Sequence, residues 1–212
     1  MSPLEQVVIE SEYENPEKLQ ARAEGVRIYR ELSGRTSIPV GKQYWTLSAL
    51  QTTNPTSEIN QMVALGLCTK EQFYGADELV ELIEQNKINH PEAHWLAGDW
   101  YGIISQDGFN PELIYLDLTS MADSPFSADI TYRTMKACPP DTVLLVNVAL
   151  TNPWSGHKTE IEPLFEHITD KMTEAECAQW NLEDFPLFTY CGSGCTVMCT
   201  VGLKKSMERR TS

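Results

Sequence analysis

The 212-residue sequence has no apolar run near the roughly 20 residues that a membrane-spanning helix requires. Its first ten residues lack the basic stretch and apolar segment of a secretory signal peptide. Basic residues are scarce, 16 against 30 acidic ones, which gives a net charge of −14. Such a surface repels phosphate backbones and acidic lipids. We therefore expect a cytoplasmic protein with no membrane association, and direct nucleic-acid binding is disfavoured.

Several enzyme motifs are missing as well. Neither a Gly-x-Ser-x-Gly elbow nor a P-loop occurs, which disfavours an α/β-hydrolase or a P-loop nucleotidase. Histidines are few and scattered, and we predict no metal site. The six cysteines are expected to be free thiols, because a chain of this size needs no disulfide. Three of them, Cys191, Cys195 and Cys199, are spaced four apart, and we interpret them as small core residues rather than metal ligands.

What the sequence does contain is a regular alternation of short apolar runs and amphipathic stretches. Residues 1–14 look like an extended arm, and a helix begins at Asn15-Pro16-Glu17 and ends at Gly34. Strands are predicted at 43–49, 72–76, 93–98, 113–116 and 142–148, with helices at 57–65, 77–86, 129–138 and 161–168. A hairpin follows, at 185–190 and 196–201.

This rhythm predicts a fold of the α/β class. We expect a Rossmann-like, mostly parallel sheet with helices on both faces and a C-terminal antiparallel hairpin strand. We divide the chain into an N-terminal arm and helix, residues 1–40, and an α/β domain, residues 41–212. In such sheets, ligands bind beyond the carboxyl ends of the strands. The residues that follow each strand are therefore the candidate site residues.

The first three strand ends suggest ligand contacts. Ser48 opens a hydroxyl-rich loop before a helix, which suits an anion but equally a capped connection. Asp77 is placed to accept hydrogen bonds from ribose hydroxyls, and it also suits a helix N-cap. Gly98, Asp99 and Trp100 offer a hydrogen-bond acceptor and a stacking surface for a purine. The alternative there is a Gly-Asp turn with Trp100 in the core.

The later strand ends suggest a reaction side. Asp117, Thr119 and Ser120 lie close together in sequence on a predicted loop. These side chains either contact the reacting group of a substrate or only make hydrogen bonds within a turn. Asn147 lies in an apolar strand and needs partners if it is buried. It is therefore either a site residue or a structural bridge. Asp117, Thr119 and Asn147 are our catalytic candidates, with His157 as a weaker candidate for a general base.

At these strand ends the chain resembles the class I S-adenosylmethionine-dependent methyltransferases. The residues that carry the resemblance are Phe-Tyr-Gly-Ala-Asp77, Leu-Ala-Gly-Asp99 and Ile-Tyr-Leu-Asp117, together with the closing hairpin. The resemblance covers roughly residues 43–204. It implies that S-adenosylmethionine is the cofactor, with Asp77 on the ribose, Asp99 on the adenine and the loop around Ser48 on the methionine end.

The sequence departs from this family in two places. Leu47-Ser-Ala-Leu-Gln51 stands where the family has a glycine-rich loop, and no Asn-Pro-Pro-Tyr motif follows the fourth strand. The resemblance thus implies methyl transfer to a small molecule or a protein rather than to a DNA base. A second hypothesis is a methyltransferase fold that has lost catalysis and serves as a binding or structural protein in a larger assembly. A phage origin is a further hypothesis for which no residue pattern argues.

Overall fold

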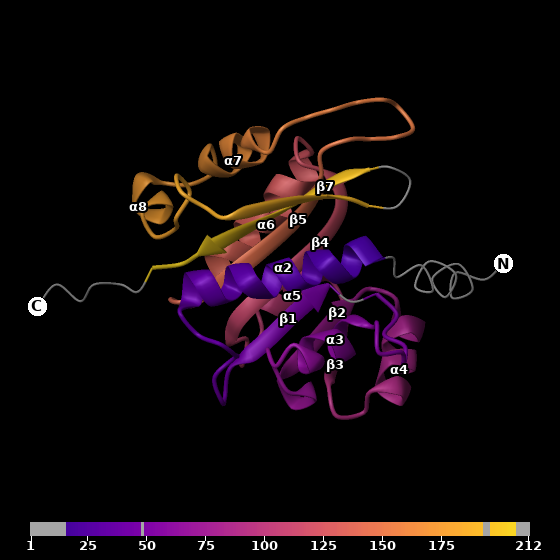
Figure 1. Ribbon diagram of the computed structural model, residues 1–212. Coiled ribbons are helices and arrows are strands. Elements are labelled where there is room, and N and C mark those ends of the chain that lie inside the picture. Colours follow the sequence, from indigo (N-terminus) through magenta and orange to yellow (C-terminus); the bar gives the residue numbers. More distant parts are fainter. Residues whose placement is uncertain (1–15, 48, 193–195, 207–212) are drawn as a thin grey trace, which may run out of the picture.

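The computed structural model describes residues 16–47, 49–192 and 196–206, and for Thr119 it describes only the backbone. The predicted arm at 1–14 and the candidates Ser48 and Cys195 lie outside the described residues. Within the described part of the chain, strands and helices alternate as the sequence predicts (Figure 1).

The strands form one seven-stranded sheet in the order β3-β2-β1-β4-β5-β7-β6. Neighbours from β3 to β5 run parallel, whereas β7 is antiparallel to both β5 and β6. This confirms the Rossmann-like, mostly parallel sheet with a C-terminal antiparallel hairpin. The strands are β1 (Gln43–Leu47), β2 (Phe73–Asp77), β3 (His94–Ala97), β4 (Pro111–Met121), β5 (Val143–Ala149), β6 (Leu187–Cys191) and β7 (Val197–Lys204).

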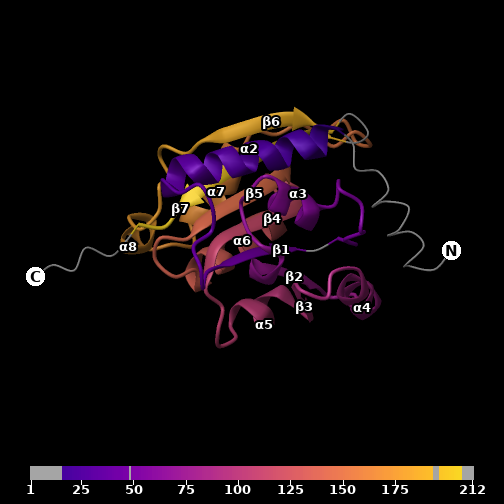
Figure 2. The same cartoon turned by 60° about the horizontal axis from the view of Figure 1, so that its bottom comes forward.

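Helices cover both faces of the sheet, as predicted, and Figure 2 shows α2 and α5 on opposite sides. The first face carries α2 (Pro16–Ser33), α3 (Glu58–Ala64) and α4 (Val80–Asn89). The second face carries α5 (Trp100–Ile104), α6 (Pro125–Ala137) and α7 (Glu162–Thr169). A 3-10 turn, η1 (Lys70–Gln72), precedes β2, and α8 (Glu174–Cys177) follows α7.

Side-chain alternation along the strands explains why there are two cores. In β1, Tyr44 belongs to the core under α2 and Trp45 to the core under α6, because successive side chains point to opposite faces. All seven residues of β5 are buried, as expected for a central strand covered on both sides. Helix α2 lies across β5, β7 and β6, and Phe188 of the C-terminal hairpin packs against the first core.

Two parts of the structure differ from the prediction. Strand β4 does not end at Leu116, because it pairs with β5 at Asp117 and, after a shift in register, again at Met121 opposite Ala149. Asp117 and Thr119 therefore lie within a strand, not on the predicted loop. The short helix α5, which begins at Trp100, was not predicted.

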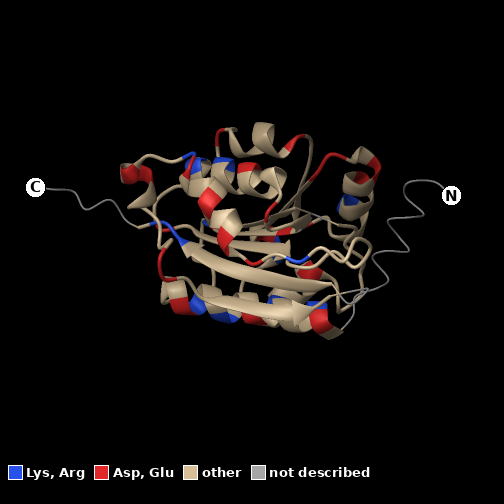
Figure 3. Cartoon of the chain, turned by 90° about the horizontal axis from the view of Figure 1, so that it is seen from above, with Lys and Arg blue, Asp and Glu red and all other residues tan. Residues whose placement is uncertain are grey.

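Acidic side chains are spread over the helices and loops, whereas the strands β6 and β7 are almost free of charge (Figure 3). Among the helices of the described residues, none combines the length and apolar character that crossing a membrane demands.

Candidate functional site

The three predicted carboxylates lie at the same edge of the sheet. Asp77 is the last residue of β2, and Asp99 comes two residues after β3, the neighbouring strand. Asp117 lies in β4 just past the end of β1, since Thr46 of β1 pairs with Tyr115 of β4. Strand β1 separates β2 from β4, and the direction of the strand order reverses there. This is the place where open α/β sheets bind their ligands.

Asp77 also closes the turn before α4. Its Oδ1 accepts a hydrogen bond from the backbone N–H of Leu79 at 2.8 Å, and its own carbonyl accepts from Gly98 at 2.9 Å. Burial raises the pKa of the Asp77 carboxyl above its usual value. A carboxylate offers about four lone-pair positions, so this turn leaves capacity for a hydroxyl-bearing ligand. The turn role and the ligand role are compatible, as the sequence indicated.

The purine surface predicted at Trp100 is wrong. Trp100 is only 5% exposed, and its Nε1 donates to Thr134 Oγ1 at 2.9 Å. Its ring contacts Trp45 and Phe109, so it is a core residue. The cause is α5, which begins at this residue and turns the indole inward. Asp99 stays exposed and caps α5 by accepting from the N–H of Gly102 at 3.1 Å.

The loop after β1, where the family has glycines, is held in place by α4. Asn86 Oδ1 accepts from the N–H of Gln51 at 2.7 Å, and Asn89 Nδ2 donates to the Gln51 carbonyl at 2.8 Å. His90 Nε2 lies 2.8 Å from the Thr52 carbonyl oxygen. Sequence reasoning missed these three side chains. Their spacing, three and then one residue along the end of a helix, was the signal that could have found them.

The end of the same loop carries a buried polar atom without a partner. Ser57 is 2% exposed, and its Oγ makes no hydrogen bond in the described structure. The side chain of Gln51 caps α3 instead, because its Oε1 accepts from the N–H of Ile59 at 3.2 Å. Buried hydroxyls are nearly always hydrogen-bonded in folded proteins, so an orphan of this kind is a candidate ligand contact.

Asp117 belongs to a network that crosses four strands. Asn147 Nδ2 donates to Asp117 Oδ1 at 2.6 Å and to the Tyr190 hydroxyl at 2.9 Å. Thr200 Oγ1 donates to Asn147 Oδ1 at 3.0 Å. Asn147 is fully buried and uses both its donors and its acceptor, so it bridges other residues and does not face a ligand itself. The sequence analysis missed Tyr190 and Thr200, although their alternation in the hairpin put them on one face.

A second acid lies near Asp117. Glu58, in the first turn of α3, is 4% exposed and accepts a hydrogen bond from the Tyr44 hydroxyl at 2.5 Å. Burial raises the pKa of Glu58, and the charge of Asp117 adds to that effect while Arg22 opposes it. The edge of the sheet between β1 and β4 thus holds two carboxyl groups and one guanidinium in a poorly solvated space.

Histidines and other ligand types do not gather into a metal centre in the described residues. His90 and His94 are four residues apart in sequence, but α4 ends at Asn89 and the two side chains do not share a helix face. The ring of His90 is buried, whereas His94 is exposed on β3 and stacks on Tyr74. His157 Nε2 lies within hydrogen-bond distance of Asp123 Oδ2, at 2.6 Å, between two surface loops. Of the predicted core cysteines, Cys199 is buried, but Cys191 is exposed on the edge strand β6.

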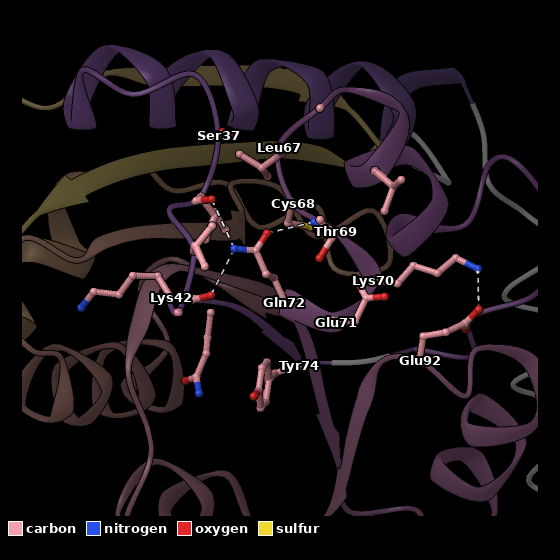
Figure 4. Close-up of a pocket in the computed structure, with 16 residues that line it drawn as sticks. Ser37, Lys42, Leu67, Cys68, Thr69, Lys70, Glu71, Gln72, Tyr74 and Glu92 are labelled. Carbon is pink, nitrogen blue, oxygen red and sulfur yellow. Dashed lines mark hydrogen bonds and ion pairs between the residues drawn. The ribbon is translucent and has the colours of Figure 1, made fainter.

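An open cavity of about 940 Å³ lies elsewhere, at the amino ends of β1 and β2 (Figure 4). Gln72 spans its wall, because its Nε2 donates to the carbonyls of Ile38 and Pro39 and its Oε1 accepts from Thr69. The polar groups of Gln72 are thus used within the wall. The cavity is at the edge opposite the carboxylates and is not part of the candidate site.

Comparison with solved structures fits this arrangement. An O-methyltransferase from Bacillus cereus in complex with SAH has a TM-score of 0.53 and 11% identity, over 86% of this chain and 81% of that chain. The N-methyltransferase NodS from Bradyrhizobium japonicum WM9, in complex with S-adenosyl-L-homocysteine, has a TM-score of 0.54 and 14% identity, over 92% and 90%. The chain has a methyltransferase-like fold. At these identities, the likeness concerns the fold alone.

This methyltransferase-like fold is divergent in sequence. No protein-family model matches the chain. No curated protein sequence matches it. The similarity to these structures therefore lies in the strand order and the C-terminal hairpin. The argument for a ligand site rests on the acids at the strand ends of this chain.

Proposed function

We propose that this protein binds S-adenosylmethionine at the carboxyl edge of the sheet and transfers its methyl group to a small molecule or a protein. The observation that carries the proposal is the pair of acids on neighbouring strand ends, Asp77 and Asp99, within a methyltransferase-like fold. The solved structures with this fold include proteins whose complexes hold SAH.

The residues present fit the cofactor at its nucleoside end. Asp77 lies at the strand end where it can accept hydrogen bonds from the two ribose hydroxyls, and the exposed Asp99 can accept from the adenine amino group. At the other end, the unpartnered Ser57 hydroxyl suits the amino-acid portion. The loop after β1, which precedes Ser57, is not rich in glycine, and side chains of α4 hold it in place. Ser48, which lies outside the described residues, stays a predicted contact.

When bound, S-adenosylmethionine supplies a methyl carbon already activated by its positive sulfur. The protein then needs chiefly to hold an acceptor atom in line with that carbon, which reduces the entropy cost of reaction. Asp117 is the candidate to orient the acceptor and to take its proton. Asn147 would position Asp117 rather than touch the acceptor, and Thr119 stays a predicted contact in the same strand.

The second candidate function is binding without catalysis. It is favoured by the replacement of the glycine-rich loop and by the side chain of Gln51, which occupies the start of α3. A protein partner or a place in an assembly would then be the role of this fold. A cytoplasmic location stays a prediction under either function.

Titration calorimetry with S-adenosylmethionine and S-adenosylhomocysteine tests the proposal. The wild-type chain should bind both ligands. Asp77→Asn keeps an oxygen for the Leu79 turn but removes the charge, and it should weaken binding about tenfold or more, as the loss of charge-assisted hydrogen bonds predicts. Asp107→Asn is the matched control, since Asp107 is exposed on the loop after α5.

The outcomes separate the two functions. Absence of binding of either ligand at millimolar concentration rejects the cofactor proposal altogether. Binding that Asp77→Asn leaves unchanged rejects the assigned site. Tight binding of both ligands, without methyl transfer to any acceptor when labelled S-adenosylmethionine is incubated with candidate substrates, favours the non-catalytic function.

A further inference from the structure

Two oxygens flank the amide of Asn147, and each accepts one of its hydrogens. These are Asp117 Oδ1, at 2.6 Å, and the Tyr190 hydroxyl, at 2.9 Å. The two hydrogens of a planar amide point about 120° apart, so the two oxygens lie roughly 5 Å from each other. A ligand atom that bonded both oxygens at an ordinary hydrogen-bond length of about 2.8 Å would lie between them.

The protons in this network have defined directions. Asp117 Oδ1 and the Tyr190 hydroxyl both accept from the Asn147 amide nitrogen, so the amide oxygen faces Thr200 and accepts the hydrogen of its Oγ1. Asp117 consequently presents a hydrogen-bond acceptor. Tyr190 accepts from Asn147, and its own proton is left to be donated to something else. The two oxygens thus offer a ligand one acceptor, on Asp117, and one donor, on Tyr190.

Burial divides the four residues into two pairs. Asn147 and Thr200 are 0% exposed, whereas Asp117 and Tyr190 are only partly buried. The buried pair can orient but cannot meet a ligand. The partly buried pair can meet one, and Asp117 lies just past the end of β1, where the proposed cofactor site begins.

We propose that Asp117 and Tyr190 together bind the hydroxyl oxygen of the methyl acceptor, so that the reaction is an O-methylation. This inference rests on the proposed function. A hydroxyl donates its hydrogen to Asp117, accepts the hydrogen of Tyr190 with one lone pair, and keeps a second lone pair for the new bond. A neutral amine nitrogen has a single lone pair, which the hydrogen bond from Tyr190 would occupy. The pair therefore selects an alcohol or phenol over an amine.

The proposed step balances. The acceptor oxygen forms a bond to the methyl carbon, and its proton passes to the Asp117 carboxylate. The electron pair of the broken carbon–sulfur bond stays on sulfur, which leaves as a neutral thioether. Asp117 and Tyr190 are the residues that touch the acceptor. Asn147 and Thr200 are positioning residues, which keep the carboxylate and the phenol turned toward the same point.

Nuclear magnetic resonance of the Asn147 side-chain amide tests this site without requiring turnover. The probes are phenol and aniline, which have nearly the same shape but differ in the reacting atom. Each is added at millimolar concentration to the full chain, with and without S-adenosylhomocysteine. Phenol should shift the Asn147 amide signals saturably. Aniline should bind about tenfold more weakly, because its nitrogen lone pair is shared with the ring and accepts the Tyr190 hydrogen poorly.

Variants then assign the roles. Tyr190→Phe should weaken phenol binding about tenfold, while Tyr132→Phe, on α6 at the other face of the sheet, should leave it unchanged. Thr200→Val removes the proton that fixes the Asn147 amide and should weaken phenol binding. Thr200→Ser restores that proton and should rescue it. A merely structural role for Thr200 would lower stability in Thr200→Val without changing the preference for phenol over aniline.

Three results overturn the inference: no shift with phenol, equal shifts with phenol and aniline, or unchanged phenol binding in Tyr190→Phe. Titration of the same sample with S-adenosylhomocysteine distinguishes a failure of the acceptor site from a failure of the proposed function. Cofactor binding without the phenol response rejects the acceptor site only. A phenol response without cofactor binding rejects the proposed function but leaves a hydroxyl-binding site.

Discussion

His90 Nε2 lies 2.8 Å from the carbonyl oxygen of Thr52 and so fastens the end of α4 to the loop after β1. The imidazole is 1% exposed, and its Nδ1 has no partner in the described structure. Because Nε2 faces a carbonyl, it carries the ring's hydrogen when the imidazole is neutral. Protonation would add a second N–H at Nδ1 with no acceptor to receive it.

The first prediction is a loss of stability in mild acid that depends on His90. Burial lowers the pKa of His90 below its ordinary 6.5, and the bond to Thr52 only partly offsets this. As the pH falls below about 6.5, the unfolded chain binds the proton first, so the free energy of unfolding decreases until the folded pKa is reached. The slope is at most about 1.4 kcal/mol per pH unit.

Thermal unfolding between pH 5 and pH 8 checks this. His90→Gln retains a donor for the Thr52 carbonyl but does not titrate, so its unfolding temperature should fall less on acidification than that of the wild type. His167→Gln, an exposed position on α7, should follow the wild type. Parallel profiles for the wild type and His90→Gln would show that this histidine does not control the response.

The second prediction concerns the packing of α2 on β7. A Cβ at Gly202 would overlap the side chain of Ile28 and approach Leu32 Cδ1 to 3.0 Å. Gly202→Ala should therefore force α2 away from the sheet and lower the free energy of unfolding by about 1–3 kcal/mol. The measurement is chemical denaturation.

A second glycine is the control. Gly102 lies inside α5 with only the Asp99 carboxylate near its position for a Cβ, at 3.9 Å. Gly102→Ala should be neutral or stabilise by up to about 1 kcal/mol, because alanine favours the helix. Equal effects of the two substitutions would contradict the close approach of α2 and β7.

The third prediction concerns a buried carboxylate at the amino edge of the sheet. Glu112, at the start of β4, is 2% exposed and pairs with Arg35, which also bonds Asp141 at 2.8 Å. Arg35→Ala would leave the buried Glu112 carboxylate without its cationic partner and should destabilise the protein by about 2 kcal/mol. The effect is smaller than for a wholly buried pair, because the Arg35 side chain is 38% exposed.

Equilibrium unfolding of a double variant separates charge from packing. Arg35→Ala combined with Glu112→Gln should recover part of the lost stability, since no unpaired carboxylate charge then stays buried. The surface residue Arg27 pairs with Glu24 and Glu31 on α2, and Arg27→Ala should cost no more than about 1 kcal/mol. If Arg35→Ala lowered the free energy of unfolding by no more than Arg27→Ala does, the unpaired charge of Glu112 would not be costly and the prediction would be wrong.

The fourth prediction orders the thiols by reactivity. All five described cysteines are free, which confirms the sequence prediction for those five. Burial raises the pKa of Cys68 and Cys138 to about 12 and that of Cys199 to about 11, so their thiolate fractions are minute near neutral pH. Cys191 is exposed on β6.

Brief alkylation of the native protein, read by peptide mass spectrometry, should modify Cys191 first and spare Cys68, Cys138 and Cys199. After denaturation, the buried thiols should react as well. Rapid labelling of Cys138 in the native state would mean that the core under α6 opens readily.

The residue pattern was sufficient for the fold because most of the elements have a local signature in the sequence. The apolar run of β5 indicated a central strand, and an asparagine followed by Pro16, the first residue of α2, marked a helix start. Alternation of strands and helices then left a parallel sheet as the simple arrangement. It was insufficient for the end of β4, since the extended conformation of Asp117 to Met121 depends on β5, a strand about 30 residues away along the chain.

The sequence by itself determined that Asp77, Asp99 and Asp117 would reach one edge, because parallel strands bring their carboxyl ends together. Only the tertiary structure decided what surrounds them. Trp100 turned inward because α5 begins there, and Asn147 became a bridge because Thr200 and Tyr190 arrive from a hairpin at the far end of the chain. Asn147 is separated in sequence from Tyr190 by 43 positions and from Thr200 by 53. Hydrogen bonds over such separations leave no local signature, since the sequence around either partner does not reveal the pairing.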